Sequence, residues 1–297
     1  MSARRERGTA VIMAMLIVAA VATLVSGALW QQSALMRETE NELQHAQARW
    51  LMRGAIDWAA VILAEDARTS SVDHRGEPWA VPLADTRLNE NDGRAPAFIA
   101  GGIQDEQAKL NLRNLATPEG IEPRELEALR RLLGALSINV QLAEPIAQRM
   151  QAAVRAAADE RPALALVSAD ELLALDGIEA AARERLRGFV TVLPEPTRVN
   201  ANTAAAEVLV SQVAELELLD ARRLVAGRDR AYFRDAGDVR GRLSQAGVQQ
   251  GEAELAVATR FFTIEGMVSF GGAQLRARAL VKRDGKRLRL LWLKEVV

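Results

Sequence analysis

The first apolar segment of the chain constrains everything that follows it. No charged residue occurs from Thr9 to Met36, and the short basic leader Arg4-Arg5-Glu6-Arg7-Gly8 precedes this stretch directly. Its apolar core, Ala10 to Trp30, is about 21 residues long, which as a helix spans roughly 31 Å and matches the hydrocarbon thickness of a bilayer. We therefore expect a membrane-spanning helix with its basic end in the cytoplasm and the rest of the chain outside.

A cleaved secretory signal peptide is the alternative interpretation, with Ser26-Gly27-Ala28 as its cleavage site. The apolar run continues past this site to Trp30, however, and residues 31–65 contain no proline. Small and apolar residues there recur close to the helical period, at Leu43, Ala46, Trp50, Gly54, Trp58 and Val61 or Ile62. The sequence thus predicts one retained helix from about Thr9 to about Asp66, apolar in its first half and amphipathic in its second.

This layout, a basic leader ending in glycine followed by a long half-apolar helix, resembles the type IV pilins and pseudopilins. The resemblance implies cleavage by a prepilin peptidase between Gly8 and Thr9. Most members of that class carry a glutamate at the fifth residue after the cut. The resemblance implies that this glutamate pairs with the amino terminus of a neighbouring subunit, but here Met13 stands at that position. A carboxylate inside a bilayer is costly unless it is paired, so Met13 fits a subunit that has no neighbour above it and caps the filament.

Further short stretches resemble one family within that class, the K-type minor pseudopilins of type II secretion. They follow the family order across nearly the whole chain: Gln47-Ala48-Arg49-Trp50, Arg53-Gly54-Ala55, Asp73-His74-Arg75-Gly76-Glu77-Pro78-Trp79-Ala80, Leu110-Asn111-Leu112-Arg113-Asn114-Leu115, Val192-Leu193-Pro194, Asn200-Ala201-Asn202-Thr203-Ala204 and Arg260-Phe261-Phe262. The resemblance implies a non-enzymatic subunit, anchored in the inner membrane with a periplasmic head, that caps the pseudopilus tip and helps to initiate its assembly for protein export.

The same resemblance implies the partners of such a subunit. These are the I, J and H types of minor pseudopilin, the prepilin peptidase and the inner-membrane secretion platform, with secreted substrates as an open further candidate. We expect the second half of the helix to pack against the helices of other minor pseudopilins. The packing seam would consist of Leu43, Ala46, Trp50, Gly54 and Trp58.

The remaining sequence predicts an α+β head with a pilin-like antiparallel sheet. Strand-like segments are Ala97 to Ile103 and Ala108 to Leu112, expected to pair, and then Phe261 to Phe270, Gln274 to Arg283 and Lys286 to Lys294. Gly271-Gly272 and Asp284-Gly285 lie between the last three at hairpin spacing. Alternation of Leu275, Ala277, Ala279 and Val281, and of Leu288, Leu290 and Trp292, with mostly polar residues predicts one buried face. Ser70 to Asp92 is expected to form an irregular connection.

Between the two sets of strands, Pro118 to Ala258 is predicted to be almost entirely helical. Helical patterns cover Glu122 to Leu136, Gln141 to Ala158, Ala169 to Leu175, Glu179 to Val190, Thr203 to Ala214 and Asp220 to Arg228, with Ser168 to Glu171 as a capping box and Asn202 as a helix N-cap. The expected organisation is a leader (1–8), the N-terminal helix (9–66, with 9–30 in the membrane), the first part of the head (67–117), an insertion of two small helical units (118–258) and the C-terminal strands (259–297).

The inserted lobe supports a rival hypothesis of DNA binding, because its units resemble the SAM-like or helix-hairpin-helix units of membrane-anchored DNA-uptake receptors. Their hairpins hold phosphate on backbone amides. The first hairpin here reads Gly177-Ile178-Glu179 and the second, Glu215 to Asp220, has three acidic residues and no glycine. Arg222, Arg223, Arg228, Arg230 and Arg234 are more typical of a solvated helical face, and the formal net charge is −1, so we expect no nucleic acid as a partner.

An enzyme or a metal protein finds little support in the sequence. His45 and His74 have no nucleophile at motif spacing, Asp73-His74 is expected to be a hydrogen-bonded loop pair, and we assign no catalytic residue. Family members can carry an acidic calcium-binding loop in the lobe. The corresponding region, around Ala156 to Ala163, offers only Asp159 and Glu160, followed by Arg161 and Pro162, which is too few donors for a site of about six to eight ligands. We assign no metal ligand and no cofactor.

Overall fold

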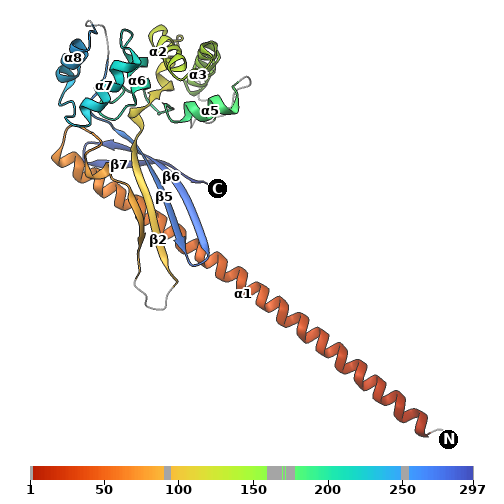
Figure 1. Ribbon diagram of the computed structural model, residues 1–297. Coiled ribbons are helices and arrows are strands. Elements are labelled where there is room, and N and C mark those ends of the chain that lie inside the picture. Colours follow the sequence, from red (N-terminus) through yellow and green to blue (C-terminus); the bar gives the residue numbers. More distant parts are fainter. Residues whose placement is uncertain are drawn as a thin grey trace.

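A single long helix supports the whole molecule. The structure is a computed structural model that describes residues 3–89, 95–158, 169, 171, 178–248 and 254–296. Helix α1 (Ala3–Thr69) is unbroken, which confirms the predicted continuity and extends the helix into the leader. Its first half projects away from the head (Figure 1). Its apolar side chains from Val11 to Trp30 are exposed. By length and composition this is a helix that can cross a membrane.

The head is built on a five-stranded sheet that is antiparallel throughout. Its strands follow the order β1 (Leu83–Arg87), β2 (Ala97–Asp105), β5 (Phe261–Phe270), β6 (Ala273–Asp284) and β7 (Arg287–Val296). The last three strands lie within two residues of their predicted bounds. Gly271 and Gly285 have φ values of +58° and +60°, the left-handed conformation that such hairpin turns require and that glycine adopts without strain.

Two expectations about the strands are wrong. Ser70 to Asp92 contains β1 and a 3-10 turn, Pro78–Ala80, and is not wholly irregular. The segment 108–112 does not pair with Ala97 to Ile103. Its residues Leu110–Asn111 (β3) pair in parallel with Val190–Thr191 (β4) inside the lobe, because the 3-10 turn Glu106–Ala108 redirects the chain after β2.

The alternation predicted for the last strand also breaks. Leu280 pairs with Trp292 and the next residue, Val281, pairs with Leu290, so Leu291 is a bulge residue. Leu288 consequently packs on the helix side of the sheet, whereas Leu291 and Trp292 pack on the other side with Leu280. Leu275, Ala277, Ala279 and Val281 are buried as predicted.

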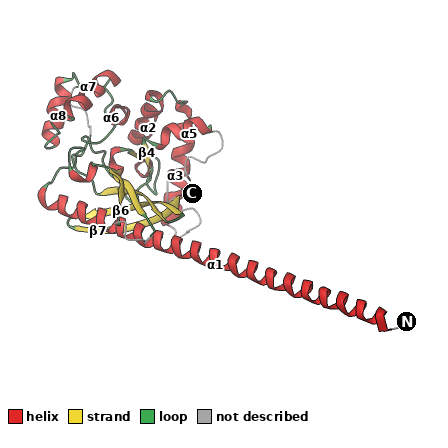
Figure 2. Cartoon of the chain, turned by 60° about the horizontal axis from the view of Figure 1, so that its bottom comes forward, coloured by secondary structure: helices red, strands yellow, loops and turns green. Residues whose placement is uncertain are grey.

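The helical lobe is inserted between β2 and β5, which confirms the α+β class with a helical insertion. Its described helices are α2 (Pro123–Ala135), α3 (Ala143–Ala158), α5 (Ala180–Arg187), α6 (Ala206–Gln212), α7 (Leu218–Arg228) and α8 (Ala236–Gln245), with 3-10 turns at Leu112–Leu115 and Val140–Leu142. Figure 2 shows the sheet lying between α1 and this lobe. Most of Ala169 to Leu175, the capping box at Ser168 and the hairpin at Gly177 lie outside the described residues.

Two helix boundaries differ from the prediction for local reasons. The helix expected over Glu179 to Val190 ends at Arg187, because Val190 enters β4. The helix expected to start at Thr203 starts at Ala206, and its N-cap is Ala205, not Asn202. The Asn202 side chain instead binds the distant backbone of Phe233, accepting from its N–H at 2.7 Å and donating to its carbonyl at 2.9 Å.

The head contains two main hydrophobic cores. One lies between α1 and the sheet and includes Met52, Leu63, Trp79 and Phe262. The other fills the lobe. The buried leucines of 110–115, a segment that the sequence assigns to the first part of the head, pack in this second core.

Candidate assembly surface and the junction behind it

The second half of α1 attaches the head through one face only. Ala48, Met52, Ile56, Ala59 and Leu63 are buried in the core shared with the sheet. The approach is close, since a Cβ added at Gly266 of β5 would stand 2.8 Å from the Met52 sulfur. Glycine at 266 therefore lets the strand lie against the helix.

The opposite face of the same half-helix is uncovered. Trp50 and Trp58 are 77% and 63% exposed, and Leu43 and Val61 are also exposed. At about 100° per residue, Trp50 and Val61 lie roughly 160° and 180° around the helix from Met52. Indole and branched apolar side chains on this side make an apolar stripe that the chain itself does not bury.

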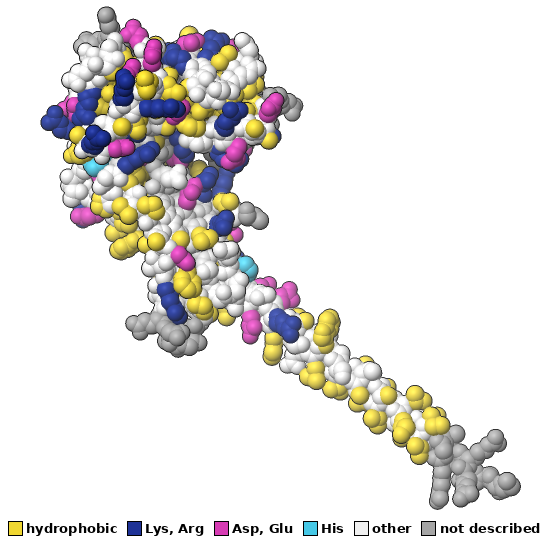
Figure 3. All heavy atoms as spheres, in the orientation of Figure 1, with side chains coloured by type: hydrophobic (Ala, Val, Ile, Leu, Met, Phe, Trp, Pro, Cys, Tyr) yellow, Lys and Arg dark blue, Asp and Glu magenta, His cyan; other side chains and the backbone are white. Residues whose placement is uncertain are grey.

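The remaining residues of the predicted seam follow the same face. Gly54 is exposed, and a Cβ added there would meet no atom within 4 Å, while Ala46 is half-buried. Met13 is exposed in the apolar half, whereas the side chains of Gly8 and Thr9 lie outside the described residues. Figure 3 shows hydrophobic side chains over the projecting part of α1 and charged ones where it nears the head.

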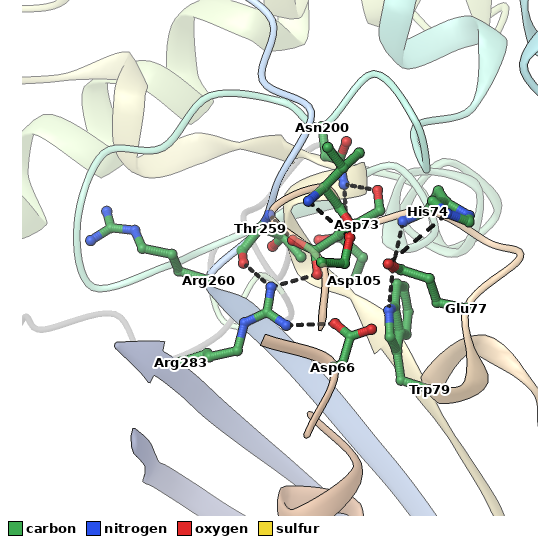
Figure 4. Close-up of polar contacts among 12 residues, drawn as sticks. Asp66, Asp73, His74, Glu77, Trp79, Asp105, Asn200, Thr259, Arg260 and Arg283 are labelled. Atoms are coloured by element: carbon green, nitrogen blue, oxygen red, sulfur yellow. Dashed lines mark hydrogen bonds and ion pairs between the residues drawn. The ribbon is translucent and has the colours of Figure 1, made fainter. Parts of the chain in front are cut away.

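A buried ion cluster connects the end of α1 to the sheet, and the sequence did not reveal it. Arg283 of β6 donates to Asp66 of α1 at 2.9 Å, to Asp73 at 2.5 Å and to the Thr259 carbonyl at 3.0 Å (Figure 4). Asp73 also accepts from the Thr259 N–H at 2.7 Å. No motif spacing links these residues, because the partners on α1 and its following loop are separated from Thr259 and Arg283 by most of the chain.

The loop after α1 is held by its own polar contacts. Glu77 accepts from the indole N–H of Trp79 and from the His74 N–H, each at 2.8 Å. The His74 ring stacks on Tyr232 of the lobe, with ring centroids 4.0 Å apart. His74 and Asp73 therefore bind separate groups, and the expected hydrogen bond between them is wrong.

The lobe joins the same junction through Asn200 and Thr203. Both donate to Asp105 at the end of β2, at 2.8 and 2.6 Å, and Asn200 donates to the Asp73 carbonyl at 3.1 Å. Helix, loop, sheet and lobe thus meet in one polar cluster. Burial raises the pKa of Asp66 and of Asp105 to about 6 and raises the pKa of Asp73 as well, and neighbouring carboxylates add to each shift.

Asp66, Asp73 and Glu77 offer oxygen atoms within 4.8 Å of one another, the spacing of a metal site. Arg283, the Thr259 N–H and the Trp79 indole already bind these carboxylates. Their arrangement is that of a structural ion pair network. The loop considered for calcium, with Asp159 and Glu160, lies outside the described residues.

The arginines of the DNA-binding hypothesis are mostly engaged within the protein. Arg228 is buried and donates to the Ala201 carbonyl, and burial lowers its pKa to about 10, so its assignment to a solvated face is wrong. Arg222, Arg223 and Arg234 form ion pairs with neighbouring acidic side chains, Glu207, Asp220 and Asp238 respectively.

Comparison with known proteins agrees with this architecture. Two family models described as type II secretion system (T2SS), protein K, match residues 108–195 and 199–259. Among curated relatives, type II secretion system protein K of Klebsiella pneumoniae is 30% identical over 95% of this chain and 94% of its own length. The Pseudomonas aeruginosa protein K is 28% identical over 95% and 91%.

One solved structure is similar in fold. A chain of the GspK-GspI-GspJ complex from the type 2 secretion system of enterotoxigenic Escherichia coli matches with a TM-score of 0.64 and 18% identity, over 88% of this chain and 99% of that chain. This similarity is evidence for the fold, whereas the family models and the curated relatives are evidence for the family. The chain therefore belongs to the type II secretion system protein K family, whose members are minor pseudopilins.

Proposed function

We propose that this minor pseudopilin is a non-enzymatic cap of the pseudopilus tip, anchored in the inner membrane until partner subunits extract it. The observation that carries this proposal is the division of α1 into two faces, one holding the head and the other exposing Trp50 and Trp58. The relative of similar fold was solved together with GspI and GspJ proteins, and we infer that I, J and H types also bind here.

The division of α1 favours a helical partner. The exposed stripe and the apolar half belong to one unbroken helix, with the charged segment 37–42 between them, so a parallel helix from a neighbouring subunit would contact this chain both inside and outside the bilayer. The small residues Ala46 and Gly54 alternate along the seam with the bulky Trp50 and Trp58. They would allow the backbone of a partner helix to come close to α1 beside the tryptophans. Each such partner helix replaces lipid contacts with packed side chains, which is how assembly would draw the subunit from the membrane.

The capping role rests on the two ends of the molecule. The lobe lies at the end of the head far from the N-terminus (Figure 1), where a further subunit stacked above would meet it. At the other end, Met13 provides no carboxylate for the amino terminus of such a subunit. Residues 1–8 would be removed by the prepilin peptidase before assembly.

Paired substitutions test this function. Trp50→Ala with Trp58→Ala should leave thermal unfolding of the head unchanged, because neither side chain is part of a core, but should sharply lower recovery of other minor pseudopilins with the detergent-solubilised chain. Val81→Ala is the control, since Val81 is 68% exposed and lies outside α1, between the 3-10 turn Pro78–Ala80 and β1. Undiminished recovery of partners by the tryptophan variant would refute the seam.

Processing is tested by N-terminal sequencing. Chains from membranes of cells with the prepilin peptidase should start at Thr9, and those from cells without it should retain Gly8. A start near Leu29 in both strains would identify an ordinary exported protein and remove the basis for a membrane-anchored cap.

A further inference from the structure

The five-stranded sheet ends in two very different edge strands. β1 is five residues long, follows Pro82 directly, and shifts its register with β2 between Leu83 and Thr86. Short length, proline and irregular pairing are features that protect natural sheet edges from pairing with other chains. β7 is ten residues long and has neither proline nor glycine. Among the described residues, no strand pairs with its outer side.

β7 is also rich in apolar residues, although none of its residues is fully buried. Leu290, Leu293 and Val296 are 37%, 40% and 49% exposed. The register places Leu293 opposite Ala279 and Leu290 opposite Val281, both of which are buried beneath α1. The two leucines therefore lie on the helix side of the sheet but at its margin, where they are only partly covered.

Basic side chains accompany this apolar edge. Lys286, Arg287, Arg289 and Lys294 stand on or next to β7, whose own single acidic residue is Glu295, and Asp284 of β6 stands opposite Arg287. Lys294 lies 3.8 Å from Glu171 of the lobe. Arg287 and Arg289 form no ion pair within the described part of the chain, and Arg289 stands opposite another cation, Lys282. The β6–β7 hairpin thus carries a local excess of positive charge, although the whole protein has a formal net charge of −1.

We propose that β7 binds an acidic, partly apolar strand of a neighbouring minor pseudopilin, which extends the sheet. This inference rests on the proposed function, which supplies the class of partner. The outer backbone groups of β7 would give main-chain hydrogen bonds, Leu290 and Leu293 an apolar contact, and Arg287 and Arg289 a preference for carboxylates. The same arginines disfavour a second copy of this chain, because two β7 strands side by side would bring like charges together.

Photo-crosslinking in cells tests the edge in the full chain. A photoreactive phenylalanine analogue replaces Leu293 on β7 or, as the matched control, Leu83 on β1, which is 43% exposed. We expect an adduct with another minor pseudopilin from position 293 and none from position 83. Arg287→Glu with Arg289→Glu should reduce the adduct by about tenfold or more, whereas Arg287→Lys with Arg289→Lys should retain it, because like charges across a contact are strongly unfavourable.

Every other result overturns the proposal. These results are an adduct from position 293 only with a second copy or a secreted protein, equal adducts from positions 293 and 83, a charge-reversed variant that crosslinks normally, and no adduct. The same analogue at position 58 separates this inference from the proposed function. An adduct from position 58 without one from 293 refutes the edge and leaves the helix seam standing, whereas no adduct from either position counts against both.

Discussion

Replacing Arg283 with methionine is predicted to loosen the head from its supporting helix. The substitution keeps an apolar stem of similar length but removes the donors to Asp66, Asp73 and the Thr259 carbonyl. The Arg283, Asp66 and Asp73 side chains are 9%, 5% and 1% exposed, so water cannot readily replace the lost bonds. Removing one partner of a buried ion pair costs about 3 to 5 kcal/mol. For a head of roughly 230 residues, 67–297, this lowers Tm by about 6 to 20 °C.

The assay is thermal unfolding of the full chain in detergent, followed by near-UV circular dichroism, which reports the packing of buried Trp79 beside the junction. Arg278→Met on the same strand is the control. Arg278 pairs with Glu265 at 2.7 Å, but both side chains are about 40% exposed, and such a pair contributes about 1 kcal/mol or less. The loss of Tm caused by Arg283→Met should be smaller at pH 5, because the unpaired carboxyls of Asp66 and Asp73 take up protons there. Equal Tm values for the two variants at pH 7 would refute the role assigned to the buried cluster.

Three further predictions concern the junction, the sheet and the membrane helix. Because burial raises the pKa of Asp105 to about 6, the folded state binds a proton at this carboxyl more tightly than the unfolded state does. Protonation of Asp105 therefore stabilises the folded state by on the order of 3 kcal/mol below pH 4, and this contribution is lost as the pH rises through 6. Urea midpoints should therefore fall between pH 5 and pH 7, and less so in Asp105→Asn; equal slopes would contradict this. A Cβ at Gly101 would stand 2.3 Å from the Glu265 carbonyl, so Gly101→Ala should cost about 1 to 3 kcal/mol by urea unfolding, whereas Gly102→Ala, whose Cβ meets Pro82 only at 3.9 Å, should cost clearly less. Met13→Glu should leave secretion unchanged or lower it, because a cap offers the carboxylate no partner; improved secretion would argue against the cap.

The long helix and the last three strands could be predicted from local patterns in the sequence. The long helix follows from composition and period, and β5 to β7 follow from strand-like segments separated by glycine turns. The exposed stripe of α1 could be predicted because its residues share a helical face. The opposite face, with Ala48, Met52 and Leu63, is as apolar, so the period alone could not say which face holds the head.

Contacts between distant segments could not be predicted from the sequence. Asn202 has the side chain of a helix cap, yet its amide binds the backbone of Phe233, 31 residues away, and not the next turn. Arg228 and Arg283 resemble surface cations, but both are buried: Arg228 donates to the Ala201 carbonyl, and Arg283 donates to carboxylate and carbonyl oxygens of other elements. Leu110 is predicted to join the large sheet because nothing local distinguishes β3 from a strand of that sheet.

Thiol labelling of the outer face of α1 tests most directly whether partner helices cover it. The chain contains no cysteine, so a single substitution gives an unambiguous signal. Leu43→Cys and Val61→Cys report the exposed stripe, and Val81→Cys reports an exposed residue of the head outside α1. In cells lacking the other minor pseudopilins all three should react with maleimide, and in cells containing them only Val81→Cys should remain reactive. Equal labelling of Leu43→Cys and Val61→Cys in both strains would contradict assembly through this face.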